Sequence, residues 1–184
     1  MKIVRVITAS TVPLVLFAGC TSTHSVDTLA TGARVAGKPT PEAAAMFDQI
    51  KALEGDWYMT DDNGQEHLAM EFDVIAAGSA VREIMFRDSE AEMTNLYHLD
   101  GNKLVITHYC AAGNQPRMVA TSTASDGSIP FKFESVSNLV SADGSYMGSL
   151  VLHMPDSNTL IEDWGTYMGE KLDSNRHRFD LKRR

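Results

Sequence analysis

The sequence predicts an all-β protein, an antiparallel up-and-down barrel of about ten strands preceded by one short helix. Three observations lead to this fold class. From Trp57 onward, apolar and polar residues alternate with a period of two. Turn-forming residues recur at short and fairly even spacing. A helical period of apolar residues occurs once, before the first predicted strand.

The predicted helix begins at Thr40, an N-cap residue type that is followed by Pro41 at the first helical position. Gly55 stands where such a helix would stop. One face of the helix is apolar, and a short amphipathic helix must bury that face on another element, here the sheet. The apolar face consists of Met46, Phe47, Ile50 and Leu53.

The strand pattern is clearest in residues 68–74, 131–134 and 177–182, each of which reads as a half-buried antiparallel strand. Turn signals between the strands indicate hairpins. A sheet with one apolar face and no second helical layer closes its edges most readily as a barrel, and a two-sheet sandwich is the alternative. The turn signals are Asn63-Gly64, Ala77-Gly78-Ser79, Asp88-Ser89, Asp100-Gly101, Gly113-Asn114, Asp126-Gly127, Asp143-Gly144, Pro155-Asp156-Ser157-Asn158 and Leu172-Asp173-Ser174-Asn175.

The N-terminal segment predicts export and lipid attachment. Lys2 and Arg5 precede a mostly apolar run at residues 6–18, the layout of a secretory signal peptide and short for a transmembrane helix. The run ends in Leu-Phe-Ala-Gly-Cys at residues 16–20, which resembles a bacterial lipobox, where the cysteine thiol takes a diacylglycerol. We therefore expect a signal peptide at residues 1–19 and a lipid on Cys20. The alternative is an apolar N-terminal helix packed on the domain.

Residues 20–39 are expected to join the lipid to a folded domain at residues 40–184. Beyond Cys20 the segment is rich in Thr, Ser, Ala and Gly, and it reads as a flexible tether with a reach of about 25 Å. Thr21 follows the cysteine, and in Gram-negative lipoproteins a residue other than Asp at this place directs sorting to the outer membrane. The expected location is the cell envelope, on the outer membrane and facing the periplasm.

The charge balance disfavours two classes of partner for the folded domain. The chain has 24 acidic and 16 basic residues, a formal net charge of −8. Nucleic acid and anionic lipid would both be repelled. The predicted partners are therefore a small-molecule ligand and, through the lipid on Cys20, the membrane.

Two segments resemble a known group of barrels. Residues 47–57, a short helix that runs into a Gly-x-Trp strand, resemble the calycin group, which comprises lipocalins, fatty-acid-binding proteins and nitrobindin-like barrels. More narrowly, residues 97–101 and 107–118 are similar to a bacterial lipocalin-like family of unknown function. The resemblance implies a barrel with a cavity that holds a small apolar or planar ligand.

The resemblance also raises the question of haem, the best-known ligand of nitrobindin-like members. After Trp57 the sequence continues Tyr58-Met59-Thr60 and lacks the further glycines of their haem-edge strand. The cofactor is therefore left unknown, with haem as an alternative. If haem were bound, His177 on the last strand would be its axial ligand.

The segment around His108 holds the residues best suited to chemistry. Leu104, Ile106, His108 and Cys110 are expected to share one strand face. If that face is internal, His108 and Cys110 point inward about 7 Å apart. Both are zinc ligand types, but no further ligands accompany them, so we predict no metal. Two alternatives stay open for Cys110, a buried apolar residue or a functional thiol.

Tyr97 and His98 belong to the strand before His108 and are predicted to line the ligand site. The turn between the two strands has either two or three residues, so His98 and His108 lie on opposite faces or on the same face. The simplest interpretation of these polar residues is a hydrogen-bonded lining of the barrel.

The segment Gly113-Asn114-Gln115-Pro116-Arg117 is predicted to be a connection with specific polar content. In one hypothesis Arg117 lies at the cavity mouth and holds the acidic group of a ligand, with Asn114 and Gln115 beside it. In the other, Arg117 pairs with an internal carboxylate such as Glu83 or Glu162 and locks the loop.

Glu162 and Trp164 are predicted to alternate on one face of a late strand, together with Thr166. An inward Glu162 needs a partner, for which Arg82, Arg117 or a histidine is available. Asp163 points to the opposite face, so Glu162 and Asp163 do not form a catalytic pair.

We therefore predict a membrane-anchored, extracytoplasmic and non-catalytic binding protein for a small apolar or amphipathic ligand. Three alternatives remain: a haem-binding barrel, an enzyme that uses the His108 and Cys110 region, and an envelope interaction protein with a solidly packed barrel. The predicted ligand-binding residues are Tyr97, His98, His108, Cys110, Asn114, Gln115, Arg117, Glu162 and Trp164.

Overall fold

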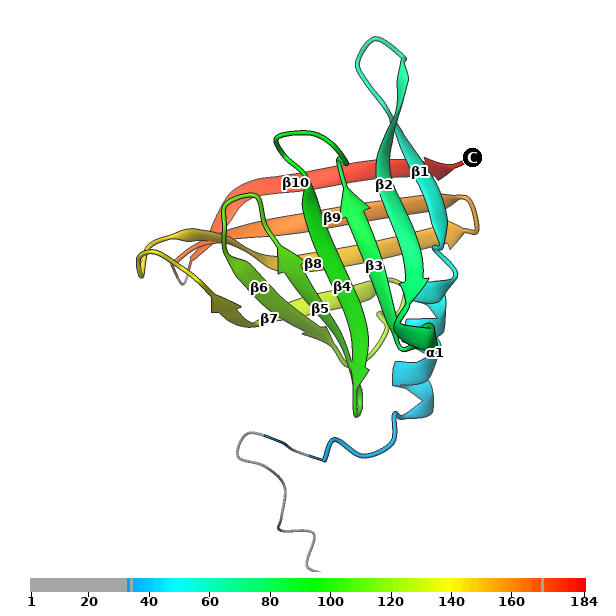
Figure 1. Ribbon diagram of the computed structural model, residues 1–184, viewed down its shortest axis with the longest axis vertical. Helices are drawn as coiled ribbons and strands as arrows, with labels where there is room; N and C mark the ends of the chain where they lie inside the picture. Colours follow the sequence, from blue (N-terminus) through cyan, green and yellow to red (C-terminus); the bar gives the residue numbers. More distant parts are fainter. Residues whose placement is uncertain (1–32, 34, 170) are drawn as a thin grey trace, which may run out of the picture. The chain divides into compact units, whose positions relative to one another are not determined.

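The described residues fold into a closed antiparallel barrel in which each strand pairs with the next and β1 pairs with β10 (Figure 1). The computed structural model describes residues 33, 35–169 and 171–184, and residues Ala36–Arg184 form one unit. The barrel confirms the predicted fold class and excludes the sandwich. The strands are β1 (Gly55–Thr60), β2 (Glu66–Ile75), β3 (Ala80–Met85), β4 (Met93–Asp100), β5 (Lys103–Tyr109), β6 (Gln115–Ala120), β7 (Ile129–Ser137), β8 (Ser145–Asp156), β9 (Thr159–Met168) and β10 (Lys171–Arg183).

The predicted signal peptide at residues 1–19 and the lipid attachment site at Cys20 lie outside the described residues. Most of the predicted tether lies outside them as well. In the part of the chain that the structure describes, no helix has the length and apolar character needed to cross a membrane.

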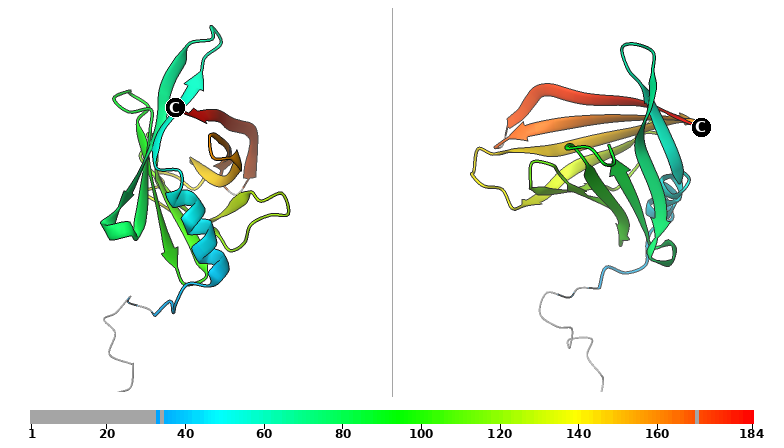
Figure 2. Two further views of the ribbon diagram at one scale, coloured as in Figure 1. Left: turned by 90° about the vertical axis from the view of Figure 1, so that its right-hand side faces the viewer. Right: turned by 45° about the horizontal axis from the view of Figure 1, so that its top comes forward.

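Helix α1 (Pro41–Lys51) forms where the cap residues and apolar spacing predicted it (Figure 2). The hydroxyl of Thr40 accepts a hydrogen bond from the Ala43 backbone N–H at 3.2 Å. Met46 and Ile50 are fully buried, and the helix packs against β4 and β5. The helix therefore lies at the end of the barrel where β1 begins, which we call the helix end. The opposite end, where β1 and β2 are joined by their hairpin turn, we call the far end.

Trp57 and Arg183 join the helix to the point where the barrel closes. Trp57 is paired with Arg183 across β1 and β10, and the Arg183 guanidinium stacks 4.6 Å from the centroid of the Trp57 ring. The Trp57 indole N–H donates to the Leu53 carbonyl at 2.8 Å. Arg183 donates to the carbonyls of Ala52 at 2.6 Å and Glu54 at 2.8 Å. These contacts hold the end of the helix against both closing strands.

Replacing Arg183 with methionine is expected to lower the free energy of unfolding by about 1–3 kcal/mol, because two charge-assisted hydrogen bonds and a cation–π contact are lost. Urea unfolding followed by tryptophan fluorescence measures this difference. The matched control is Arg178→Met, which removes only an exposed pair with Asp180 and should change stability by less than about 0.5 kcal/mol. Equal effects of the two substitutions would contradict a closing role for Arg183.

One predicted turn is wrong. Residues 172–175 were expected to connect the last two strands, but β10 already begins at Lys171, and Gly169 lies in the turn. The pairing of β9 with β10 shifts register between Leu172 and Arg176. The turn-forming residues thus fall on an irregularity within the strand.

Candidate functional site

Six polar or aromatic side chains meet inside the barrel and define what we call the interior polar cluster. Each is at most 1% exposed. They face inward because they share the phase of the apolar residues on their strands, as Glu83 does with Val81 and Met85 on β3. The members are Glu83 on β3, Asn95 and Tyr97 on β4, His108 on β5, and Glu162 and Trp164 on β9.

One wall of the cluster is a hydrogen-bonded chain across three neighbouring strands. Glu83 lies opposite Asn95, and Asn95 lies opposite His108. Glu83 Oε2 accepts from the Asn95 amide nitrogen and from the Tyr97 hydroxyl, both at 2.7 Å. His108 Nδ1 lies 2.7 Å from Asn95 Oδ1. Because the Asn95 amide nitrogen donates to Glu83, the Asn95 amide oxygen lies toward the imidazole. His108 Nδ1 therefore carries the proton, and Nε2 is an acceptor.

The other wall belongs to β9. The Trp164 indole N–H donates to Glu162 Oε2 at 2.9 Å. The Trp164 and His108 rings approach each other, with their centroids 4.9 Å apart. This contact crosses the interior from β9 to β5, because the two strands are not neighbours in the barrel. The cluster therefore spans the barrel rather than lining one side of it.

The buried carboxyls are shifted toward their protonated forms. Burial raises the pKa of Glu83 to about 7, although its hydrogen bonds from Asn95 and Tyr97 act in the opposite direction. Burial, and after it repulsion from the Glu83 carboxylate, raises the pKa of Glu162 well above its ordinary value. Near neutral pH, Glu162 therefore holds a proton and Glu83 titrates. The two carboxyls are close enough to influence each other's protonation.

His108 is neutral in the folded chain. Burial lowers its pKa to about 4, because the imidazolium ion would be cut off from water. Among the described residues its ring is hydrogen-bonded to Asn95 and not to Cys110 or Glu162. A catalytic use of this region would need a hydrogen bond from His108 to Cys110 or Glu162, and neither is formed among the described residues.

Three buried polar atoms of the cluster have no hydrogen-bond partner among the described residues. They are Glu83 Oε1, Glu162 Oε1 and His108 Nε2. Buried polar atoms are nearly always partnered, and one without a partner costs about 1–3 kcal/mol. His108 Nε2 is thus an acceptor without a partner, and the two carboxyl oxygens become acceptors as well when both carboxyls are ionised.

Within the described residues, no arginine or lysine forms an ion pair with Glu83 or Glu162. Arg82, one predicted partner of Glu162, instead pairs with Asp73 at 2.6 Å on the outer surface. The hydrogen-bond partner of Glu162 is therefore the Trp164 indole rather than a cation. In the same part of the chain, no three His, Cys, Asp or Glu side chains converge as a metal site would require.

The predicted inward position of Cys110 is wrong. Strand β5 ends at Tyr109, and Cys110 begins the turn that follows, where its backbone N–H donates to the Asn114 carbonyl at 3.1 Å. Its side chain is partly exposed. Leu104, Ile106 and His108 do share the buried face. The alternation holds only while the strand continues, and the chain turns one residue too early for Cys110.

Arg117 lies neither at a cavity mouth nor on an internal carboxylate, so both hypotheses for it are wrong. It sits in β6, where Pro116 and Met118 face inward and Arg117 faces out. Its guanidinium pairs with Glu134 at 2.5 Å and with Asp100 at 3.4 Å. Arg117 therefore clamps neighbouring strands on the outer surface.

The other residues predicted to bind the ligand near Arg117 also lie outside the interior polar cluster. The Asn114 side chain is buried and donates to the Ser145 carbonyl at 2.9 Å, which ties the β5–β6 turn to β8. Gln115 donates to Gly113 and accepts from the Ser137 hydroxyl, both at 3.0 Å. His98 lies opposite Val105 and is half-buried outside the cluster. Burial, then the Arg117 charge, lowers its pKa.

The residues present do not fit a haem. His177 lies opposite Trp164 on the pair β10 and β9, but its side chain is exposed. The interior beside it is filled by Trp164 and by Phe179, whose ring meets that of Phe86 edge to face at 5.5 Å. An axial ligand needs to lie in an enclosed pocket, and the His177 side chain is exposed instead.

Of the cluster, Asn95 was missed by the sequence analysis, and Glu83 was named only as an internal carboxylate that could pair with Arg117. The signal was present, because each stands in the apolar phase of its strand: Glu83 between Val81 and Met85, and Asn95 between Met93 and Tyr97. Polar residues in such positions indicate buried, hydrogen-bonded side chains.

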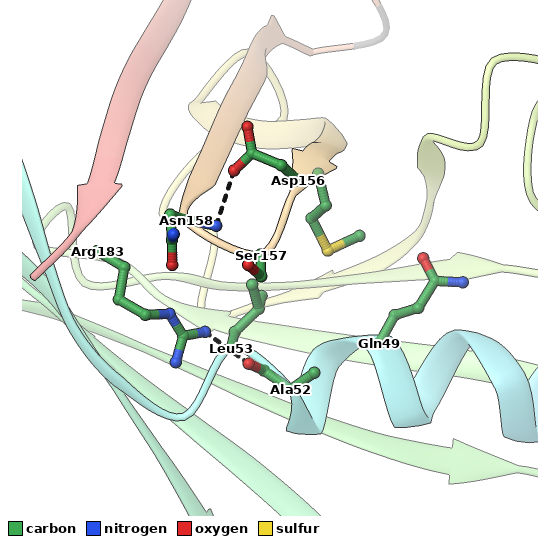
Figure 3. A pocket seen from close by; sticks show the side chains of 8 residues that line it. Gln49, Ala52, Leu53, Asp156, Ser157, Asn158 and Arg183 are labelled. Carbon is green, nitrogen blue, oxygen red and sulfur yellow. Dashed lines mark hydrogen bonds between the residues drawn. The ribbon is translucent and has the colours of Figure 1, made fainter.

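A surface pocket of about 410 Å³ opens at the helix end (Figure 3). It lies between α1 and the turn that joins β8 to β9. Leu53 and Met154 form its apolar floor, and both belong to the barrel core or pack against it. The lining residues are Gln49, Ala52, Leu53, Met154, Asp156, Ser157, Asn158 and Arg183.

Fold and site together define a ten-stranded antiparallel barrel whose interior holds buried titratable side chains. A scan against models of protein families and a search among curated proteins both found no match to this chain.

Proposed function

We propose that the protein is a non-catalytic binding protein of calycin type, which holds a small apolar or amphipathic molecule inside its barrel. One observation carries the proposal: three buried polar atoms, Glu83 Oε1, Glu162 Oε1 and His108 Nε2, have no hydrogen-bond partner among the described residues, in an otherwise apolar interior. A solid core of the same size would be more stable with apolar side chains in these places. A ligand that supplies the missing hydrogen bonds would explain why these positions hold polar side chains.

The surroundings of the cluster suit an apolar ligand body. The Tyr97 ring of the cluster packs against two phenylalanine rings. Its centroid lies 6.5 Å from that of Phe72 and 6.0 Å from that of Phe131. These side chains are close-packed, so a ligand enters only if some of them move. The core is rich in methionine, whose flexible thioether adapts to a changed volume. The buried methionines are Met46, Met70, Met85 and Met118.

We place the entrance at the helix-end pocket. Leu53 and Met154 separate this pocket from the core, and Met154 is only partly buried. A displacement of Met154 and of the end of α1 would open a path between the helix and the β8–β9 turn. The barrel itself need not break any strand pairing for this.

The proposed location is the cell envelope, on the outer membrane and facing the periplasm. The signal-peptide pattern at residues 1–19, the lipobox-like segment that ends at Cys20 and Thr21 support it. A lipid on Cys20 and a tether would hold the barrel near the bilayer, where apolar molecules partition.

Tryptophan emission tests the proposal, because the chain has two tryptophans. In Trp57→Phe the remaining emitter, Trp164, lies in the cluster; in the matched control Trp164→Phe, the emitter lies at the helix end. We expect the neutral fluorophore N-phenyl-1-naphthylamine to bind the full chain saturably at about one per chain. We expect it to quench Trp164 more strongly than Trp57. Failure to bind, or quenching of Trp57 alone, would contradict an interior site.

A second candidate, an envelope interaction protein with a packed barrel, is favoured by exposed apolar side chains at the far end. Val140 is 98% exposed, Met168 56% and Leu172 53%. The β7–β8 and β9–β10 turns touch there, since the Gly169 N–H donates to the Gly144 carbonyl at 3.3 Å. If the fluorophore does not bind, this candidate takes the place of the first.

A further inference from the structure

We propose that the ligand carries a protonated amine, which the interior polar cluster binds between Glu83, Glu162 and His108. The inference rests on the proposed function and names the polar group that the barrel selects. It replaces the acidic group that the sequence suggested through Arg117, because that arginine faces outward and is paired.

The first argument is charge. Two carboxyls, Glu83 and Glu162, are fully buried side by side. Buried carboxylates are normally paired with a cation. Within the described residues, no lysine or arginine forms an ion pair with either carboxyl. Arg82 pairs with Asp73 instead, and Arg117 pairs with Glu134 and Asp100. A cation brought by the ligand would take the place of the proton that Glu162 holds before the ligand binds, and both carboxylates would then be paired.

The second argument is hydrogen bonding. A primary ammonium group has three N–H donors and no acceptor. Three polar atoms of the cluster have no partner among the described residues: Glu83 Oε1, Glu162 Oε1 and His108 Nε2. All three accept once both carboxyls are ionised, which a cation beside them favours. His108 Nε2 is kept as an acceptor because Asn95 Oδ1 takes the proton-bearing Nδ1 at 2.7 Å. A carboxylate ligand would place acceptors against acceptors, and a hydroxyl would supply a single donor.

Aromatic rings surround the cluster. The Trp164 ring lies tilted against His108 with centroids 4.9 Å apart, and the Tyr97 ring lies between Phe72 and Phe131. Aromatic faces attract cations and also cover apolar surface. The chemical class that fits is therefore an amphipathic amine, with a compact ammonium group on an apolar body.

Calorimetry near neutral pH with 1-octylamine, 1-octanol and octanoate tests the inference on the full chain. We expect the amine to bind at least about tenfold more tightly than the alcohol, and octanoate to bind more weakly than either. Glu162→Gln should weaken amine binding about tenfold and alcohol binding by a smaller factor, because only the amine loses an ion pair. The matched control is Asp163→Asn, which removes the neighbouring carboxylate on the outer face, where it pairs with Arg176. This control should leave amine binding unchanged.

The outcomes separate the two proposals. If alcohol or octanoate binds as tightly as the amine, or if Asp163→Asn weakens the amine as much as Glu162→Gln does, the amine inference is wrong while an interior site can stand. If none of the three compounds binds and the fluorophore also fails, the proposed function itself is wrong. Glu83→Gln serves as the second variant if Glu162→Gln does not fold.

Discussion

Replacing Glu83 with alanine is expected to lower the free energy of unfolding by about 3–5 kcal/mol. The substitution leaves the Asn95 amide and the Tyr97 hydroxyl without their shared acceptor, in a place where water does not reach them. It also opens a cavity in the core. Urea unfolding at about pH 6, where the carboxyl is largely protonated, measures the loss.

The control is Glu83→Gln, whose side-chain carbonyl can accept the same two hydrogen bonds. We expect it to cost less than about 1.5 kcal/mol. If alanine and glutamine have the same small effect, the hydrogen bonds to Glu83 do not support the barrel, and the interior polar cluster loses its structural basis.

The second large effect is a loss of stability as the pH rises above about 6.5. Folding raises the pKa of Glu83 from 4.5 to about 7, so the folded chain favours the protonated carboxyl. The stability that the protonated Glu83 contributes is fully present below its ordinary pKa of 4.5 and is lost as the pH rises through about 7. Glu162, whose pKa is raised further, extends the decline to higher pH.

His108 acts in the opposite direction, but in a lower pH range. Folding lowers its pKa from 6.5 to about 4, so its contribution is present above the ordinary value and is lost as the pH falls through about 4. Between the folded pKa of His108, about 4, and its ordinary value of 6.5, the carboxyl and imidazole effects on the free energy of unfolding oppose each other. Above about pH 6.5 the carboxyl pair acts without that opposition.

Urea unfolding at intervals from about pH 6 to about pH 9 checks this expectation. The parent chain should become steadily less stable, and the double variant Glu83→Gln with Glu162→Gln should show a much flatter profile. An equally steep decline in the double variant would assign the pH dependence to other groups.

The sequence predicted the barrel because its signals are local. Period-two alternation, hairpin turns and a capped helix each involve residues within a few positions, and the structure forms them nearly where expected. The same alternation grouped His108 with Leu104 and Ile106, and Glu162 with Trp164, and the structure buries both groups. Phase along a strand thus predicts which side chains share a face, but not that the face is internal.

The failures concern distant pairing and strand ends. Arg117 finds Glu134 through the register of β6 with β7, which contains an irregularity beside Arg117 that no local pattern reveals. Glu83 meets Glu162 across the barrel, a contact set by curvature and closure rather than by spacing. Cys110 was misplaced because alternation does not say where a strand ends.

The most direct test of the central claim is the ¹⁵N NMR signal of the His108 side chain. We expect Nε2 to resonate as an unprotonated nitrogen, and to shift on saturation with N-phenyl-1-naphthylamine while Nδ1 stays protonated. The exposed His67, which pairs with Asp61 on the surface, should not change. If the fluorophore saturates the protein and the His108 signal stays unchanged, the ligand binds elsewhere and the interior polar cluster is not the site.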